Sequence, residues 1–375
     1  RQPGEPLAPG QIWNSNRFQL RAALALPWIE AADLGAVPDE PERLRRALAE
    51  AAAQADLVHA TWGGGGAITL REAVAEPFAK ATGIGVTVAE VPNTAGVVRS
   101  PTASQYDAVT VTFFEAAGMA DQGLLETFED SDIPGLADLP PDMVVRDSAG
   151  KVVGLTAYFA FYGIAINTDY VSRDDFKSWN DLADPKWKGR LAVTRAVYSA
   201  PYDLTMFAYA NGGDSADVEP GMASLKGLIA NSLTTYTSMA HMNTLLTSGE
   251  AVAAPYYSSR VWHMREEGLK NIEIAVPEEG ALILPYVVVV PKGSANKADV
   301  AKYLDYLLRA DVQVNLSVST GNIPASNKAQ LPATFEESFG MTRDDMISRM
   351  VNPDWSRIVE HYEERTNAVE QMMAQ

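Results

Sequence analysis

The sequence contains no cysteine, which excludes disulfides, thiol nucleophiles and cysteine-ligated metals. Long apolar runs are also missing: Ala157–Ile166 and Ala281–Val290 are about half the roughly 20 residues that a membrane-spanning helix needs. Basic residues are scarce, with 30 Lys and Arg against 48 Asp and Glu and a formal charge of −18. Because phosphate is held by basic patches, this balance predicts that neither nucleic acid nor anionic lipid is a partner.

Motifs for catalysis are lacking as well. The four histidines form no H-x-H or H-E-x-x-H pair, and no G-x-S-x-G nucleophile motif is present. The glycine run Gly63–Gly66 is neither a Walker loop nor a G-x-G-x-x-G fingerprint. We therefore expect no enzyme, no metal and no cofactor, and keep a hydrolase or transferase on the same scaffold as the alternative from another class.

The composition is that of a folded chain with more than one core, since 47% of its 375 residues are hydrophobic. It starts with Arg1, which we interpret as processing, with a signal peptide removed. Three early prolines and two amphipathic stretches predict that residues 1–56 form an N-terminal helical extension.

From residue 57 onward, β-type and α-type patterns alternate over about 290 residues, too many for one sheet with one core. The economical solution is two α/β lobes. We expect strands at Leu57–Ala60, Val86–Val91, Tyr106–Thr112, Ala157–Asn167, Arg190–Thr194, Ala251–Pro255, Ile272–Val276 and Leu282–Val290, and helices at Ala67–Ala81, Ala116–Gly123, Tyr202–Asn211, Gly221–Ala230 and Ala298–Leu308.

Polar and aromatic residues cluster where several of these strands end. Thr61, Trp62 and Gly63–Gly66 follow the first strand, and open α/β sheets bind ligands at such carboxyl ends. Arg195, close to Tyr198, ends another strand and is suited to grip a carboxylate or phosphate. A third cluster, Tyr256-Tyr257-Ser258-Ser259-Arg260, follows a short strand and stands where a ligand loop would lie.

Six ordered segments resemble signatures of the extracellular (periplasmic) solute-binding proteins of ABC importers, family 1. Within that family they are most similar to the polyamine-binding branch. The segments are Glu76–Ile84 (EPFAKATGI), Ser178–Gly189 (SWNDLADPKWKG), Ser248–Ala251, Pro277–Ala281, Lys292–Lys297 and Leu307–Gln313.

The resemblance implies the two-lobed periplasmic-binding-protein fold of the type II-like α/β class, with a ligand cleft between the lobes. Two crossover hinge strands would lie near Tyr158–Asn167 and Leu282–Val290. Lobe 1 would comprise residues 57–157 plus 286–375, and lobe 2 residues 158–285. It further implies a periplasmic monomer that closes over a small molecule and is then recognised by a membrane permease. A sensor module without a transporter is the alternative that the sequence leaves open.

The polyamine branch holds its cations with carboxylates and tryptophans, and here those positions differ. Arg195 stands where that branch has Asp, and Ile283-Leu284-Pro285 replaces its Trp-x-Asp. Phe159 replaces a Trp, and Phe114 a Tyr, with Thr112 near a Ser position. A dication beside an unpaired guanidinium is disfavoured.

We therefore expect a small organic anion or zwitterion, such as a carboxylate, an amino-acid-like compound or a phosphonate, with Arg195 at its anionic end. Polyamine binding, and ferric-ion binding through Tyr256 and Tyr257, are the alternatives. The expected ligand-binding residues are Thr61, Trp62, Gly63, Gly64, Thr112, Phe159, Arg195, Tyr198, Tyr256, Ser258, Ser259, Arg260 and Tyr286.

Overall fold

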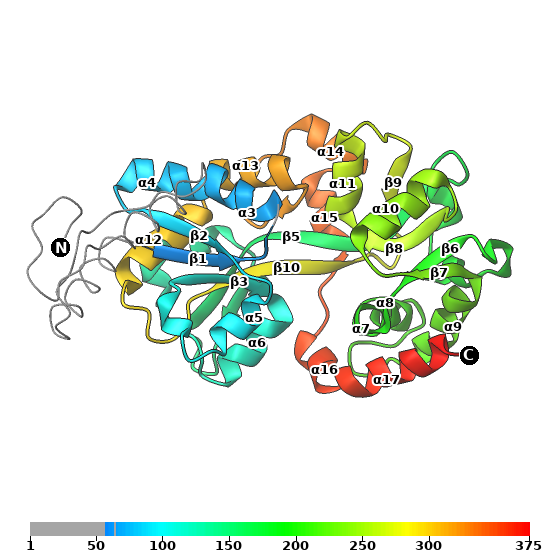
Figure 1. Cartoon of the computed structure of the whole chain (residues 1–375), viewed down its shortest axis with the longest axis horizontal. Coiled ribbons are helices and arrows are strands. Elements are labelled where there is room, and N and C mark those ends of the chain that lie inside the picture. Colours follow the sequence, from blue (N-terminus) through cyan, green and yellow to red (C-terminus); the bar gives the residue numbers. More distant parts are fainter. Residues whose placement is uncertain (1–56, 64) are drawn as a thin grey trace, which may run out of the picture. The chain divides into compact units, whose positions relative to one another are not determined.

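The computed structural model describes residues 57–63 and 65–375 (Figure 1). The expected N-terminal helical extension, residues 1–56, lies outside these described residues, and so does Gly64. Within them, no helix combines the length and the apolar character that crossing a membrane requires.

Strands and helices alternate along the described chain as the sequence predicts. The strands are β1 (Leu57–Thr61), β2 (Val86–Glu90), β3 (Ala108–Thr112), β4 (Val144–Arg146), β5 (Val152–Asn167), β6 (Leu191–Thr194), β7 (Ser232–Tyr236), β8 (Ala253–Tyr257), β9 (Ile272–Ala275), β10 (Ala281–Val289), β11 (Ile323–Pro324) and β12 (Met350–Val351). The α-helices are α3 (Gly65–Leu70), α4 (Glu76–Thr82), α5 (Thr94–Val98), α6 (Phe113–Asp121), α7 (Ala196–Ser199), α8 (Asp203–Ala210), α9 (Met222–Asn231), α10 (Met239–Ser248), α11 (Ser258–Glu266), α12 (Lys297–Leu307), α13 (Ala310–Thr320), α14 (Ala333–Phe339), α15 (Arg343–Ser348), α16 (Trp355–Glu360) and α17 (Tyr362–Met373).

Two elements differ in detail from the expectation. The helix expected at Ala67–Ala81 is divided by a π-helical turn, Arg71–Ala75, between α3 and α4. The aromatic strand begins at Val152 rather than at Ala157. Its additional residues, 152–156, are buried, and the apolar run that begins after Lys151 is interrupted by Gly154, a residue that weakens a strand pattern.

The main sheet has the order β2-β1-β3-β10-β5-β8-β6-β7. β1 pairs in parallel with β2 and β3, whereas β10 runs antiparallel to β3 and β5. The first three strands thus all present their carboxyl ends at one edge of the sheet, the edge at which open α/β sheets bind ligands.

β5 and β10 cross from one half of this sheet to the other (Figure 1). β10 pairs Tyr286 with Thr112 of β3, while β5 pairs Tyr162 with Tyr257 of β8. The two crossing strands pair with each other from Leu282–Tyr162 to Val289–Gly154, with one register shift between Tyr286 and Val287. This arrangement gives the two-lobed α/β fold with two crossover strands that the resemblance implies.

The C-terminal helices differ from the assignment of residues 286–375 to lobe 1. α17 packs against α7 and α9, which follow β6 and precede β7, and α16 packs against α6. Trp355, Ile358 and Val369 are buried in the same hydrophobic cluster as Tyr202 and Leu204 of the second lobe. The apolar side of α17, which includes Val369, is therefore buried against lobe 2. We refer to residues 355–373 as the C-terminal arm.

Candidate functional site

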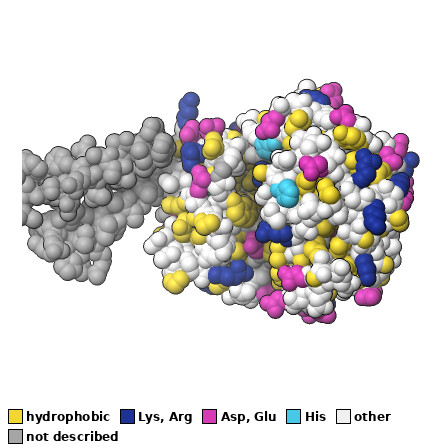
Figure 2. Space-filling model, turned by 45° about the vertical axis from the view of Figure 1, so that its right-hand side comes forward, with side chains coloured by type: hydrophobic (Ala, Val, Ile, Leu, Met, Phe, Trp, Pro, Cys, Tyr) yellow, Lys and Arg dark blue, Asp and Glu magenta, His cyan; other side chains and the backbone are white. Residues whose placement is uncertain are grey.

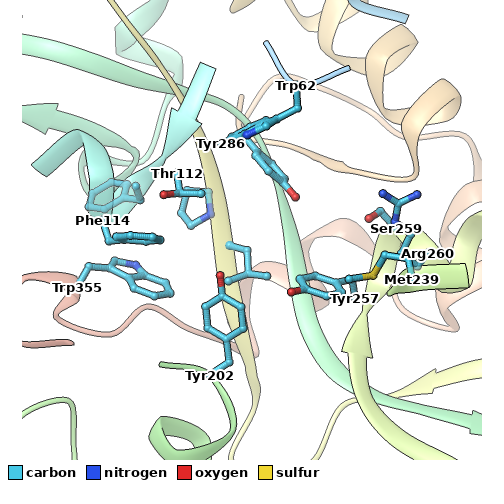
Figure 3. Close-up of a pocket in the computed structure, with 13 residues that line it drawn as sticks. Trp62, Thr112, Phe114, Tyr202, Met239, Tyr257, Ser259, Arg260, Tyr286 and Trp355 are labelled. Atoms are coloured by element: carbon cyan, nitrogen blue, oxygen red, sulfur yellow. The ribbon is translucent and has the colours of Figure 1, made fainter. Parts of the chain in front are cut away.

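A cavity of about 310 Å³, here called the first cavity, lies at the carboxyl ends of β1, β3 and β8 and beside the crossing strand β10 (Figure 3). The described residues that line it are Trp62, Thr112, Phe113, Phe114, Tyr202, Met239, Tyr257, Ser259, Arg260, Leu284, Pro285, Tyr286 and Trp355. They come from both halves of the sheet and from the C-terminal arm. The space-filling view shows a hollow in the surface with hydrophobic side chains at its edge (Figure 2).

Aromatic rings form most of the wall of the first cavity. Trp62 meets Tyr286 edge-on, with ring centroids 5.9 Å apart. Phe114 and Trp355 lie 6.2 Å apart, and Tyr202 contacts Trp355 edge-on at 6.4 Å. Rings packed against one another in this way give stiff walls, and their faces attract cations.

Three tyrosine hydroxyls, those of Tyr202, Tyr257 and Tyr286, point into the first cavity (Figure 3). None has a hydrogen-bond partner within the described part of the chain. Burial is the main cause that raises the pKa of all three phenols above the ordinary value. They therefore remain protonated at neutral pH and can donate hydrogen bonds to a ligand oxygen.

Arg260 is the only charged side chain among the described residues that line the first cavity. It stands in the first turn of α11 and is exposed. A cation near the positive end of a helix gains nothing from the helix dipole. Burial raises the pKa of the Tyr286 phenol, and the positive charge of Arg260 has a smaller, opposite effect on the same pKa. Positive charge and phenolic donors thus face the same space.

Five of the predicted ligand-binding residues line the first cavity: Trp62, Thr112, Ser259, Arg260 and Tyr286. Thr61 is buried at the end of β1, and the exposed Gly63 lies close to the Glu90 carboxylate. Gly64 lies outside the described residues.

Three other predicted residues are buried behind the wall. Phe159 is fully buried in the core, and the Ser258 hydroxyl accepts a hydrogen bond from the Phe161 backbone N–H at 3.0 Å. The Tyr256 hydroxyl donates to the Met239 carbonyl and lies 2.8 Å from Asn243 Oδ1. The position of Tyr256 follows from strand alternation, since neighbours in β8 point to opposite faces, whereas Ser258 begins α11 and Phe159 lies in β5.

Arg195 lies outside the first cavity, contrary to the prediction that it binds the anionic end of the ligand. Its side chain is exposed, with the guanidinium carbon 5.3 Å from the ring centroid of Tyr198. Tyr198, also predicted for the site, lines a neighbouring cavity and not this one. The positive charge facing the first cavity is that of Arg260, three residues after β8.

Sequence reasoning missed several wall residues. Phe114, Leu284 and Pro285 stand at positions that the family resemblance had singled out, so that comparison could have found them. Tyr257 belongs to the predicted cluster Tyr256–Arg260 but was left out of the expected ligand-binding residues. Tyr202, Met239 and Trp355 carry no local signal, because only the packing of distant helices brings them to the cavity.

A buried carboxyl group lies next to Tyr202. Asp203 is fully buried and accepts hydrogen bonds from the Tyr162 hydroxyl at 2.9 Å and the Ser199 hydroxyl at 2.7 Å. Burial raises the pKa of Asp203 to about 7, although both hydrogen bonds act to lower it. This group supports the wall of the cavity from behind.

A model of the family described as bacterial extracellular solute-binding protein matches residues 107–339. The chain belongs to this family. It is 25% identical to spermidine/putrescine-binding periplasmic protein 1 of Haemophilus influenzae over 318 residues, which are 82% of this chain and 86% of that protein. A second model, described as a probable molybdopterin binding domain, matches residues 3–114, half of which lie outside the described residues.

Solved structures of solute-binding proteins share the fold. An extracellular solute-binding protein from Bordetella parapertussis superimposes with a TM-score of 0.73 at 20% identity, covering 85% of this chain and 99% of that one. The Atu4243 GABA receptor superimposes with a TM-score of 0.71 at 24% identity, covering 85% and 98%.

These findings establish the general role of this solute-binding protein. It is a substrate-binding protein of the ABC-transporter type, and its relatives are binding proteins of transporters rather than enzymes. Proteins of this family bind small ligands and work with membrane permeases. The predicted family, fold and non-enzymatic role are thereby confirmed.

Proposed function

We propose that this solute-binding protein captures a small organic anion or zwitterion in the first cavity, with the anionic group on Arg260. The observation that carries the proposal is the charge of the wall: the described lining residues include one cation and no carboxylate. The hydroxyls of Tyr202, Tyr257 and Tyr286 would complete the shell around the anion.

The energetics favour an anion over a dication at this position. A hydrogen bond between a guanidinium and a carboxylate or phosphonate contributes about 1.5–3 kcal/mol, and phenolic donors add to it. A polyamine would place its ammonium groups beside an uncompensated positive charge, which costs free energy in a partly desolvated site.

Polyamine binding is the second candidate, because the Haemophilus influenzae relative is named for spermidine and putrescine. The Atu4243 structure, named as a GABA receptor, shows the same fold in a protein named for a zwitterion. The ferric-ion alternative loses its support, because the Tyr256 hydroxyl bonds to Met239 and Asn243 and only Tyr257 lines the cavity.

The cellular setting that we propose follows the family. The protein would act in the periplasm as a monomer, deliver its ligand to a membrane permease and bind no nucleic acid. Closure of the lobes would bend the crossing strands β5 and β10, which connect the two walls of the first cavity.

A thermal-shift screen of the full chain, unfolded and refolded to remove any carried ligand, tests the proposal. The panel comprises aliphatic and aromatic carboxylates, amino acids, phosphonates, polyamines and ferric salts. A ligand at about 100 times its Kd adds about 2.7 kcal/mol to the stability. Stabilisation by a carboxylate, an amino acid or a phosphonate supports the proposal, and stabilisation by polyamines alone overturns it.

A further inference from the structure

A second cavity, of about 620 Å³, adjoins the first one. The two share Phe114, Tyr202 and Trp355 as wall residues. The remaining wall of the second cavity comes from α6, from the segment around α7 and from the C-terminal arm. A ligand that reaches past Phe114 and Trp355 would therefore enter this second space.

The two cavities have opposite charge. Among the described residues, Arg260 is the one charged residue that lines the first cavity, whereas the second is lined by the carboxylates of Glu115, Glu360 and Glu363. Arg99, an exposed side chain, is the one basic residue among the described lining residues of the second cavity. Glu360 is already paired with Arg357 at 2.8 Å.

Glu115 is hydrogen-bonded to a residue that lines the first cavity. One of its oxygens, Oε2, accepts hydrogen bonds from the Thr112 backbone N–H at 3.0 Å and the Thr112 hydroxyl at 2.7 Å. Thr112 itself lines the first cavity. The half-buried carboxylate of Glu115 therefore lines the second cavity and is hydrogen-bonded to Thr112, which lines the first.

Tyr202 stands at the junction of the two cavities. Its side chain is only 8% exposed, and its hydroxyl has no partner within the described part of the chain. That hydroxyl points into the first cavity (Figure 3). Both Tyr286 and the Glu115 carboxylate contribute, after burial, to the raised pKa of Tyr202. A hydroxyl that has no partner in the described protein and points into a cavity is available to bond to a ligand.

We infer that the ligand is a zwitterion with separated charges, whose anionic group binds at Arg260 and whose ammonium group reaches Glu115 in the second cavity. This inference rests on the proposed function and adds to it the second charge and the second subsite. Phe114 and Trp355 line both cavities, and the faces of their rings attract the cationic end of the ligand. Tyr202 bonds to the ligand between the two ends.

Titration calorimetry with a matched series of ligands tests this inference. The series runs from 4-aminobutanoate to 7-aminoheptanoate, each compared with the unsubstituted carboxylate of the same length. We expect at least one amino acid to bind roughly 10- to 100-fold more tightly than its matched carboxylate, the range for one hydrogen bond to a charged group.

Glu115→Gln separates the ligand contact from the structural role of this residue. Glutamine keeps the capping box of α6, because its amide oxygen accepts from Thr112 as the carboxylate does. The variant should lose the 10- to 100-fold preference for the amino acid and bind the carboxylate as the wild type does. Asp121→Asn removes the same charge from the same helix, at a residue that lines neither cavity, and should leave both affinities unchanged.

The outcomes are distinguishable. If carboxylates bind as tightly as the amino acids, or if Glu115→Gln weakens both classes equally, the second subsite is overturned and the anion site at Arg260 stands. If neither class binds at any length, the inference fails, and the thermal-shift panel, which also contains phosphonates, decides the proposed function separately.

Discussion

Tyr286 of the crossing strand β10 lies directly opposite Thr112 of β3, and both side chains line the first cavity. Directly opposed residues of an antiparallel pair point to the same face of the sheet. The first cavity is therefore built on a crossing strand itself, so a bound ligand contacts the connection between the lobes. Binding and closure can be coupled through this strand without any additional element.

Arg260→Gln should weaken the binding of a carboxylate or amino-acid ligand roughly 10- to 100-fold, because it removes the one positive charge facing the first cavity. Arg195→Gln should change the affinity little, since Arg195 is exposed and stacks on Tyr198 outside this cavity. Titration calorimetry of both variants checks this. The opposite ranking would restore Arg195 as the anion-binding residue.

Trp355→Ala should cost about 3–5 kcal/mol of stability, as expected for the removal of a large buried side chain, here 4% exposed. It should also weaken binding, because it removes the ring shared by the two cavities. Urea denaturation measures the first effect and calorimetry the second. Val359→Ala, an exposed change on the same helix, is the control and should be close to neutral. Unchanged ligand affinity in Trp355→Ala would show that the arm does not contribute to the site.

Gly163→Ala should destabilise the protein by about 1–3 kcal/mol, the usual cost of overpacking a filled core. A Cβ at Gly163 would lie 2.9 Å from the Ala275 carbonyl oxygen, in the ladder between β5 and β9. Denaturant unfolding of this variant is the measurement. Gly118→Ala has open space around its added methyl and should not destabilise. Equal stabilities of the two variants would contradict the close packing seen in the crossing strand.

Stability should depend on pH through Asp203. The pKa of this carboxyl group is about 7 in the folded protein, against an ordinary value of 3.8 in the unfolded chain. Since the folded state holds this proton more tightly, the contribution is fully present below pH 3.8 and is lost as the pH rises through 7. Asp203→Asn should flatten this dependence, whereas the exposed Asp121→Asn should not. Urea unfolding at closely spaced pH values measures both. A slope that persists in Asp203→Asn would assign it to another group.

Much of the fold follows from local pattern. The alternation of apolar runs and amphipathic stretches indicated every strand of the main sheet except β7, and among the helices α6, α8, α9 and α12, because a buried face repeats with the period of its element. The start of β5 was expected too late, because Gly154 interrupts the apolar run that begins at Val152. The short helices of the C-terminal arm gave no sign of the lobe on which they pack.

The sequence by itself determined that this chain is a two-lobed solute-binding protein: its ordered motifs identify the family, and the lack of catalytic patterns is consistent with it. Tertiary structure decided which cation lines the first cavity. Arg195 and Arg260 both follow strands, and no local rule distinguishes them, because the first cavity is formed by residues far apart in the chain. Only the packing that brings Tyr202, Tyr286 and Trp355 together turns Arg260 toward that space and leaves Arg195 in solvent.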